Sequence, residues 1–455
     1  MDVRPALHKI QLNVFIDNEI YRPYNFIMNA NTWKKRWSND QIRSMLVEQY
    51  NAFIKQDTGI KRTLLKDVRK AAATPYAVII SGLRRVGKST LLAQLAKFFA
   101  QDSYYYVNFE DDRFLNFQAE DATDLYNALV ELFGEREIMI IDEIQNVPKW
   151  EHFVRRYMDL GLKFYITGSN ASLLSQDLGT RMTGRYTPFE LFPFSFSEYL
   201  LFNEEQIPDL NRMTNLERSK LIRLLKSYIN DGGIPDALKY PEINFLRTLY
   251  NDVIYRDIAA RYKLEGITAL KELAYFLISN PASLVSYNKL KERLKLGSVN
   301  TVIKYIDFLE SSWLFFTVNQ YAFSVKRQQV APKKIYSIDT GMVESVGFSF
   351  SPNSGKLLEN LVYLQLRREN KNIYYYKTEK GFEVDFYLPE ERHLVQVAEN
   401  MAEEATRNRE IRALEEAVQE IAVEKITLLT DNNEDDLSFG GINTKVQSVT
   451  EWLLK

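Results

Sequence analysis

The chain has 455 residues, of which 45% are hydrophobic and 26% are charged, enough for two to four domains that each have a core. Its 58 Lys and Arg residues against 60 Asp and Glu residues give a net charge of −2, which neither favours nor excludes nucleic acid as a partner. The absence of cysteine excludes disulfides, iron–sulfur clusters and zinc knuckles, and three scattered histidines are too few for a histidine-based metal site. No apolar run approaches 18 residues, which predicts a cytoplasmic protein that does not contact a membrane.

Residues 1–57 form an N-terminal extension that carries few signals. Residues 7–16 partly alternate between apolar and polar positions, which predicts a short strand. Asn39 can cap a helix that runs to about Lys55, and a second helix is expected over 61–72. This second helix leads directly into the most informative stretch of the chain.

Residues 76–100 combine a short apolar run, a glycine-rich turn and an apolar-periodic helix. The run 77–80 indicates a buried strand and 88–100 a helix, and the turn between them has the pattern Gly-x-x-x-x-Gly-Lys-Ser. Two glycines let backbone N–H groups point toward a phosphate, and the helix N-terminus adds partial positive charge. A lysine there can reach the β- and γ-phosphates, and a serine hydroxyl can bind Mg²⁺. The pattern predicts an ATP site formed by Gly82, Arg84, Arg85, Val86, Gly87, Lys88, Ser89 and Thr90.

A second motif lies at 138–143, where four apolar residues are followed by Asp142 and Glu143. A buried parallel strand that ends in carboxylates has this appearance, and ligands bind at that end of open α/β sheets. We expect Asp142 to hold Mg²⁺ through water, and Glu143 to orient and deprotonate the attacking water. An exposed acidic strand end would explain the two acids alone, but not their combination with the first motif.

Strand and helix patterns alternate from 76 to 191, which predicts a parallel sheet with crossover helices. The strand at 163–167 ends in Thr-Gly-Ser-Asn. This cluster, with Ser169, either senses the γ-phosphate by hydrogen bonding or provides Ser169 or Asn170 as the cap of a helix over 171–178. The sequence leaves both interpretations open. The expected elements are strands at 76–81, 104–109, 137–142, 163–167 and 186–191, with helices at 88–100, 122–133 and 150–160.

The motifs GLRRVGKST, IMIIDEIQ, FYITGSNASLL, TGR and LFPFSFSEYL occur in this order. The series resembles the prokaryotic AAA-type P-loop ATPases that carry AAA_14 and DUF4143 segments, and the resemblance covers about residues 58–455. It implies an α/β P-loop NTPase core of AAA+ type with a helical lid, a winged-helix module and a restriction-endonuclease-like domain. The implied ranges are 58–202, 203–262, 263–345 and 346–455.

The resemblance also implies roles for individual residues. A five-stranded core would have a strand between those of the two nucleotide motifs, and the strand at 104–109 fits that place. Gly232-Gly-Ile-Pro235 is similar to an element that contacts the nucleotide base, although a bare turn explains the same residues. Arg181 and Arg185 are candidates for an arginine that acts on a neighbouring subunit's nucleotide, with a structural salt bridge as the alternative; Arg185 is the preferred candidate.

The alternation stops near residue 262, and a helix is expected over 264–279. Residues 285–294 and 299–309 then form a helix-turn-helix pattern, and 313–319 and 333–337 would be the strands of a wing. Between 283 and 334, nine basic residues against three acids give a net charge of +6, as a winged helix that binds DNA phosphates requires. A module used only for protein contacts, or as a lid over the nucleotide, fits equally well. The expected DNA contacts are Lys326, Arg327, Lys333 and Lys334.

The last hundred residues are similar to the restriction-endonuclease-like fold. A helix at 355–369, strands at 373–377, 383–388 and 393–398, a helix at 403–419 and a strand at 426–430 are expected, with Glu359 on the first helix. Asp385 lies eleven residues before Gln396, where a nuclease needs a second acid, and Ala398 replaces the lysine. Glu399 should point off the opposite strand face. We therefore expect a degenerate nuclease fold.

Together these motifs predict a Mg²⁺-dependent ATPase that couples its nucleotide state to a winged-helix and nuclease-like region. The expected ligands are ATP, ADP and Mg²⁺, with DNA or a protein as a further partner, and the motifs are compatible with a homo-oligomer. The alternative is a nucleotide-gated binding or scaffold protein whose turnover is negligible; Glu143 favours hydrolysis.

Overall fold

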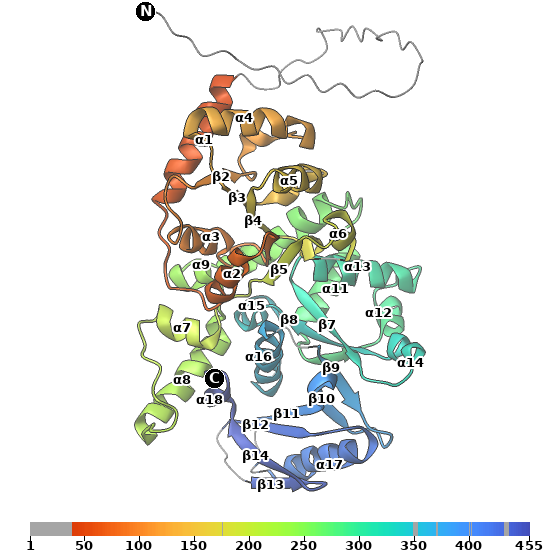
Figure 1. Cartoon of the computed structure of the whole chain (residues 1–455). Coiled ribbons are helices and arrows are strands. Elements are labelled where there is room, and N and C mark those ends of the chain that lie inside the picture. The colour runs from red at the N-terminus through yellow and green to blue at the C-terminus, as the bar shows by residue number, and fades with distance from the viewer. Residues whose placement is uncertain are drawn as a thin grey trace, which may run out of the picture.

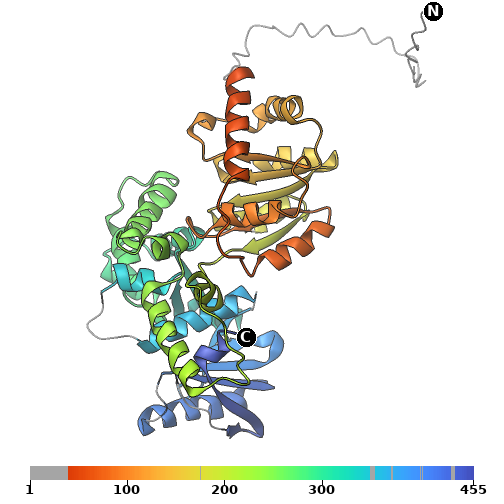
Figure 2. The same ribbon diagram turned by 90° about the vertical axis from the view of Figure 1, so that its left-hand side faces the viewer.

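The computed structural model describes residues 39–174, 176–348, 354–369, 372–399, 401, 403–431 and 436–455. The strand predicted over 7–16 lies outside these ranges. An α/β part at the N-terminal end and a mixed sheet at the C-terminal end are joined by helices and strands from the middle of the chain (Figures 1 and 2). Within the described ranges, no helix has both the length and the apolar character needed to cross a bilayer.

The first sheet has five parallel strands in the order β2-β3-β4-β1-β5, which confirms the predicted α/β class. The strand between those of the two nucleotide motifs is β4, however, and β2 lies at the sheet edge, so the place expected for 104–109 was wrong. Although β2 follows β1 in sequence, the two strands are not neighbours in the sheet, because β4 and β3 lie between them. The strands are β1 (Ala77–Ser81), β2 (Tyr104–Asn108), β3 (Ile138–Asp142), β4 (Lys163–Gly168) and β5 (Tyr186–Glu190).

Helices cover both faces of this sheet, because successive side chains of each buried strand point to opposite faces. Val78 and Ile80 of β1 belong to a core shared with the C-terminal half, whereas Ile79 belongs to a separate core with residues of α4 and α5. The predicted helices are present, with 61–72 shortened at its start and 88–100 ending four residues early. Their bounds are α1 (Asn39–Ile54), α2 (Leu65–Lys70), α3 (Lys88–Ala96), α4 (Ala122–Phe133) and α5 (Trp150–Asp159).

A helical segment follows the first sheet. Thr214 begins the longest of these helices, α8, with a capping box in which the side chains of Thr214 and Glu217 bond each other's backbone N–H. After α8, the Asp339 carboxylate accepts a hydrogen bond from Gly233 N at 2.7 Å, which joins this segment to the start of α15. The helices of this segment are α7 (Phe196–Phe202), α8 (Asn215–Asp231), α9 (Pro235–Lys239), α10 (Phe245–Asp252) and the π-helix Val253–Ala260; α6 (Gln176–Arg181) lies between β4 and β5, and α15 (Thr340–Val346) follows β8.

The second sheet has nine strands in the order β13-β14-β12-β11-β10-β9-β7-β8-β6. The two predicted wing strands pair antiparallel as β7 and β8, but β7 also pairs parallel with β9 through Asn319–Tyr374 and Gln320–Tyr375. The wing strands and the nuclease-like strands therefore form one sheet. The strands are β6 (Ser283–Val285), β7 (Phe315–Gln320), β8 (Lys333–Ser337), β9 (Tyr374–Lys377), β10 (Glu383–Leu388), β11 (His393–Ala398), β12 (Lys425–Thr430), β13 (Asp436–Phe439) and β14 (Ile442–Ser448).

The helices around the second sheet include the predicted pair α12 and α13. The segment between β7 and β8 contains the short helix α14, which the sequence pattern did not predict, and the pattern also missed β6, β13 and β14. The strand β6 has only three residues and pairs with β8, about fifty positions further along the chain, so no local pattern marks it. The helices are α11 (Thr268–Ile278), α12 (Tyr287–Arg293), α13 (Val299–Ser311), α14 (Val325–Val330), α16 (Ser354–Arg368), α17 (Glu404–Glu420) and α18 (Val449–Trp452).

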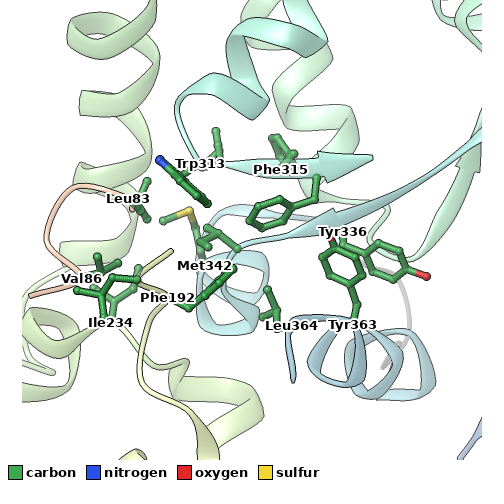
Figure 3. Packing of buried hydrophobic residues seen from close by; sticks show 14 of the residues in the cluster. Leu83, Val86, Phe192, Ile234, Trp313, Phe315, Tyr336, Met342, Tyr363 and Leu364 are labelled. Atoms are coloured by element: carbon green, nitrogen blue, oxygen red, sulfur yellow. The ribbon is translucent and has the colours of Figure 1, made fainter. Parts of the chain in front are cut away.

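One hydrophobic core joins the glycine-rich loop after β1 to the second half of the chain. Leu83 and Val86 of this loop are fully buried in the same cluster as Trp313 and Met342 (Figure 3). The Trp313 indole Nε1 also donates a hydrogen bond to Ser81 Oγ at 3.1 Å, where β1 ends. The loop is therefore supported by residues that lie more than two hundred positions further along the chain.

Candidate nucleotide-binding site

The loop between β1 and α3 can follow its path only with glycine at two positions. A Cβ on Gly82 would lie 2.2 Å from the carbonyl oxygen of Leu191, so this residue has no room for a side chain. Gly87 has φ of 92° and directly precedes α3, a backbone conformation that L side chains rarely adopt. The loop thus curls at the N-terminus of α3, as a phosphate-binding loop must.

The buried guanidinium of Arg62 holds this loop from behind. Its nitrogens donate to the carbonyl oxygens of Val86 and Phe192, each at 2.7 Å, and to Glu198 Oε1 at 3.0 Å. Burial raises the pKa of the Glu198 carboxyl, but the charge and hydrogen bonds of Arg62 outweigh burial, so that the pKa of Glu198 is lowered. The sequence analysis missed this pair, because 136 positions separate the two residues and no local pattern connects them.

Lys88 lies inside the loop, with its side chain almost fully buried. Its Nζ donates to the carbonyl oxygens of Gly82 and Leu83 at 3.3 and 3.1 Å, and lies 3.4 Å from Glu143 Oε1. The ammonium therefore connects the glycine-rich loop to the acidic end of β3. These are weak contacts for a buried cation, which a phosphate oxygen can replace.

Asp142 and Glu143 meet Lys88 at the carboxyl edge of the sheet. Burial and the neighbouring Glu143 charge raise the pKa of Asp142, which accepts hydrogen bonds from Thr167 Oγ1 and, at 3.4 Å, from Tyr106 OH. Burial also disfavours the Glu143 carboxylate, but Lys88 outweighs it and lowers the pKa of Glu143. Glu143 is therefore ionised at neutral pH, as a proton acceptor must be.

Ser169, at the end of β4, reaches the same edge. It is buried, and its Oγ accepts a hydrogen bond from Gln145 Nε2 at 3.2 Å. Gln145 Nε2 also donates to Glu143. The sequence motif contained Gln145, but the pattern of strand and acids assigned no role to it. Of the two residues considered as a cap for the following helix, Asn170 makes a local hydrogen bond: its Oδ1 accepts from Ser172 N at 2.7 Å.

The two arginines of the loop point toward the helical segment. Arg84 pairs with Asp257 of the π-helix at 3.1 Å and with Glu110 at 2.6 Å, and Arg85 lies 3.6 Å from Asp236. Asp236 follows Pro235, and Ile234 packs beside Val86 (Figure 3). Pro235 therefore lies near the phosphate loop, and its expected contact with the nucleotide base stays a prediction. Thr90, the remaining predicted contact, accepts a hydrogen bond from Gln56 Nε2 at 3.4 Å.

Arg185 lies at the opposite, amino edge of the sheet. Its carbonyl accepts a hydrogen bond from Ala77 N, at the start of β1, and its guanidinium pairs with Asp159 at 2.5 Å. Because the phosphate loop follows the other end of β1, Arg185 is directed away from the nucleotide site of its own chain. A contact with nucleotide would require another copy of the protein.

The residues at the carboxyl edge fit a nucleotide with Mg²⁺. The loop offers a glycine-lined turn, one buried ammonium and the N-terminus of α3, and Ser89 hydrogen-bonds toward Asp142. A serine hydroxyl beside a carboxylate is a suitable oxygen ligand pair for Mg²⁺. Lys88 brings the cation that the β- and γ-phosphates need.

The nuclease-like region has a second cluster of charges, around Lys334 of β8. This lysine is 2% exposed, and its Nζ lies 2.8 Å from carboxylate oxygens of Glu359, Glu383 and Asp385. The prediction that Lys334 contacts DNA was therefore wrong: its strand pairs within the sheet and directs the side chain into the protein. Burial disfavours the charge of Lys334, but these carboxylates outweigh it and raise its pKa.

A cavity of about 640 Å³ adjoins this cluster and is lined by Asp385, Gln396 and Glu399 among others. Glu399 was expected on the opposite strand face, but β11 ends at Ala398, so strand alternation no longer applies and Glu399 lines the cavity. Burial and the Asp385 charge raise the pKa of Glu359 to about 8. The described residues hold no group of three or more His, Cys, Asp or Glu side chains arranged to bind a metal ion.

The other predicted DNA contacts differ in exposure. Lys326 and Arg327 are exposed on α14, together with Phe323, whose side chain is 82% exposed. Lys333 is half-buried and donates to the carbonyl oxygen of Gln328 at 2.8 Å. Further exposed basic residues lie on α12 and α13 and in the turn between them: Lys289, Arg293, Lys295 and Lys304.

The five-stranded sheet and the loop between β1 and α3 define a P-loop nucleotide-binding protein. A family model described as "AAA domain" matches residues 74–200, and models for two domains of unknown function, DUF8612 and DUF4143, match 222–352 and 354–451. The chain belongs to the family of prokaryotic AAA-type P-loop proteins that carry a C-terminal DUF4143 domain.

Relatives occur in an archaeon and a bacterium. The chain is 33% identical over 373 residues to the uncharacterized protein MJ1544 of Methanocaldococcus jannaschii, covering 78% of this chain and 82% of the relative. It is 28% identical over 400 residues to an uncharacterized protein of Haemophilus influenzae, covering 84% of this chain and 95% of the relative. Both alignments reach well beyond the length of the AAA match.

Two solved structures have partial similarity. The Orc1 protein of Aeropyrum pernix in complex with DNA has a TM-score of 0.28 and 14% identity, covering 65% of this chain and 95% of that chain. AMPPCP-bound DnaA from Aquifex aeolicus has a TM-score of 0.24 and 17% identity, covering 54% of this chain and 86% of that chain.

Replacing Arg62 by Leu should destabilise the protein and weaken nucleotide binding. The change leaves Glu198 buried without its partner, which costs about 3–5 kcal/mol of the free energy of unfolding, and frees the Val86 carbonyl. The double variant Arg62→Leu/Glu198→Gln should regain part of the stability but not the affinity. Denaturant unfolding and fluorescent-nucleotide titration measure both quantities.

The matched control is Arg43→Leu, which removes an arginine from an exposed ion pair with Glu131 and should cost less than about 1 kcal/mol. Equal losses of stability in the Arg62 and Arg43 variants would contradict a supporting role for Arg62.

Proposed function

We propose that this protein hydrolyses ATP with Mg²⁺. One observation carries the proposal: Lys88, Asp142, Glu143 and Ser169 come from three separate elements and converge at the carboxyl edge of the sheet. A protein that only binds nucleotide would need Lys88 and the glycine-rich loop, but not Glu143. A buried, ionised glutamate beside the lysine adds a group that can take a proton from water, which supports hydrolysis over passive binding.

Each side chain has a distinct task in this proposal. Lys88 exchanges its weak carbonyl contacts for the β- and γ-phosphates, and backbone N–H groups of residues 82–89 surround the same charges. Ser89 and Asp142 would hold Mg²⁺, which neutralises phosphate charge when bound. Glu143 orients the attacking water and accepts its proton. Ser169 donates its hydroxyl hydrogen to the γ-phosphate.

Nucleotide binding at this loop would affect the rest of the chain through the two arginines. Arg84 links the loop to Asp257 of the π-helix, and Arg85 links it to Asp236 of α9. A phosphate group competes with these carboxylates for the guanidinium groups. The helical segment that carries Asp257 and Asp236 is therefore the part of the chain that would respond to nucleotide.

Lys88→Ala and Glu143→Gln should separate binding from hydrolysis. Without the ammonium, ATP affinity itself should fall. Glu143→Gln keeps the shape of the side chain but removes the proton acceptor, so ATP should bind and persist while turnover falls by a factor of about 10²–10⁴. ATP affinity and phosphate release should be measured in parallel.

Undiminished turnover in the Glu143→Gln variant would contradict the role of this residue. A parent protein that binds ATP without measurable turnover would instead favour the alternative of a nucleotide-gated binding protein.

We further propose that DNA is a partner of this protein. The exposed basic residues on α12, α13, α14 and the intervening turn support this proposal, because phosphate contacts need accessible cations. Lys326 and Arg327 are the preferred contacts. Lys333 and Lys334 are no longer proposed, since the first is half-buried and the second is enclosed by carboxylates.

Replacing Lys326 and Arg327 by Ser should weaken DNA binding and reduce its salt dependence. Each lost phosphate contact lowers the slope of log K against log salt by about 0.9. Fluorescence anisotropy with duplex DNA at several salt concentrations measures both quantities. Lys61→Ser/Lys66→Ser is a matched control, because it removes the same charge from exposed positions on the α/β part. No binding by the parent at low salt would refute the proposal.

We expect no nuclease activity from the C-terminal region. Gln396 uses its carbonyl oxygen to accept from Asp385 N at 3.0 Å and its amide nitrogen to donate to Glu410 at 2.5 Å, so these two bonds fix the amide, which brings no negative charge to a metal ion. The Asp385 carboxylate is held by Lys334 and by Val397 N, at 2.8 and 3.0 Å. Mg²⁺ would have to displace a buried ammonium to reach it.

The purified protein with Mg²⁺ or Mn²⁺ should therefore leave single- and double-stranded DNA and RNA intact over hours. Cleavage that disappears in Asp385→Ala but survives in Lys88→Ala would contradict this expectation and assign the cleavage to the cavity beside Lys334.

A further inference from the structure

Gln145 lies between two residues to which the proposed function assigns separate tasks. It belongs to the short 3₁₀ turn Ile144–Asn146 that directly follows β3 and Glu143. Its Nε2 donates to Glu143 Oε2 and also to Ser169 Oγ, the latter at 3.2 Å. Its Oε1 is buried and has no hydrogen-bond partner within the described part of the chain.

The backbone conformation before Gln145 directs its side chain toward the end of β4. Glu143 has φ of 53°, a left-handed conformation, and its N–H donates to Thr167 Oγ1 at 3.2 Å. This turn directs residue 145 back over the end of β4. A Cβ on Gly168 would lie 2.3 Å from Gln145 Oε1, so β4 leaves space here for the glutamine side chain.

The hydrogen bonds determine the orientation of the amide. Nε2 has two hydrogens, and both of its observed acceptors, a carboxylate oxygen and a hydroxyl oxygen, can accept them. The reversed orientation would place the carbonyl oxygen against the Glu143 carboxylate, which repels it. Because Ser169 Oγ accepts from Gln145, the hydroxyl hydrogen of Ser169 is left to donate elsewhere.

We propose that Gln145 is a positioning residue for ATP hydrolysis. Its amide holds the Ser169 hydroxyl, which would meet the γ-phosphate, and the Glu143 carboxylate, which would accept the proton from water. This inference rests on the proposed function. It adds a residue that contacts neither phosphate nor water and acts through Glu143 and Ser169.

The contacts of Glu143 explain why such a residue is needed. Its Oε1 lies 3.4 Å from Lys88 Nζ, and its Oε2 accepts from Gln145. When Lys88 turns to the phosphates, Gln145 remains as the contact that holds the carboxylate. The terminal torsion of a glutamate is otherwise broad, so the carboxylate would rotate away from the water. The same amide directs the hydrogen of Ser169 to the phosphate.

The test compares Gln145→Leu with the parent protein in the full chain. Leucine keeps the approximate volume but cannot donate, so kcat should fall by up to about 100-fold, while the Kd for ATP stays near the parent value. Gln145→Glu keeps the length and replaces the donor by an acceptor, and its kcat should fall at least as far. Asn146→Leu makes the equivalent change at the exposed neighbouring amide and should retain the parent kcat.

A double-mutant cycle with Glu143→Gln distinguishes positioning from structural support. If Gln145 acts through Glu143, adding Gln145→Leu to Glu143→Gln should lower the single-turnover rate much less than Gln145→Leu lowers it in the parent, the remainder being the share that acts through Ser169. An equal loss in both backgrounds, a parallel loss of ATP affinity, or an unchanged kcat in both Gln145 variants would overturn the inference. Should Gln145→Leu fail to fold by circular dichroism, Gln145→Met, which also cannot donate and adds no charge, supplies the same cycle.

The outcomes also distinguish the inference from the proposed function. A parent without turnover, or a Glu143→Gln variant with full turnover, overturns the proposed function and the inference with it. An active parent that depends on Glu143 but is indifferent to Gln145 overturns the inference alone.

Discussion

The phosphate loop depends on one buried cation behind it. Arg62 donates to the carbonyl of Val86 inside the loop and to the carbonyl of Phe192 beyond β5, while Glu198 balances its charge. Because the Val86 carbonyl points toward Arg62, the N–H of the same trans peptide faces the opposite side of the loop, where the proposed site would take a phosphate. The glycines make this backbone conformation of the loop sterically possible, and the hydrogen bond from the Arg62 guanidinium stabilises it relative to the other conformations that glycine can adopt. Two ionic side chains far apart in sequence therefore shape the site that the glycine motif marks.

Around this loop, polar contacts and apolar packing have different roles. Leu83 and Val86 face the core shared with Trp313 and Met342, which fixes the loop to the second half of the protein (Figure 3). Arg84 and Arg85 turn away from this core to Asp257 and Asp236, in ion pairs for which a phosphate could compete. Apolar packing thus fixes the position of the loop, and the two ion pairs connect it to the helical segment. Under the proposed function, nucleotide binding would act on that segment through these ion pairs and leave the apolar core packed.

The sequence predicts those parts of the structure that depend on local patterns. The loop motif, the apolar strand before Asp142 and the alternation of strands and helices all lie within short windows, and the described fold contains them. Lys334 was mistaken for a surface cation because its carboxylate partners follow it by 25 to 51 positions and give no local signal. Still larger separations in sequence concealed the pairs Arg62–Glu198 and Ser81–Trp313. Gln145 was hidden differently: its motif was visible, but its role depends on the left-handed turn at Glu143.

The hydrogen bond from Trp313 to Ser81 also has a consequence for protein synthesis. Ribosomes deliver the N-terminal part of a chain first, and domains generally fold as they emerge. The five strands of the first sheet have all been synthesised once the chain reaches residue 190. Trp313, which hydrogen-bonds to Ser81 at the end of β1, follows Ser81 by 232 positions. A nascent chain therefore carries Leu83 and Val86 without their full core until about two-thirds of the protein has been made. The nucleotide site is built early but completed late, when the second half of the chain packs against it.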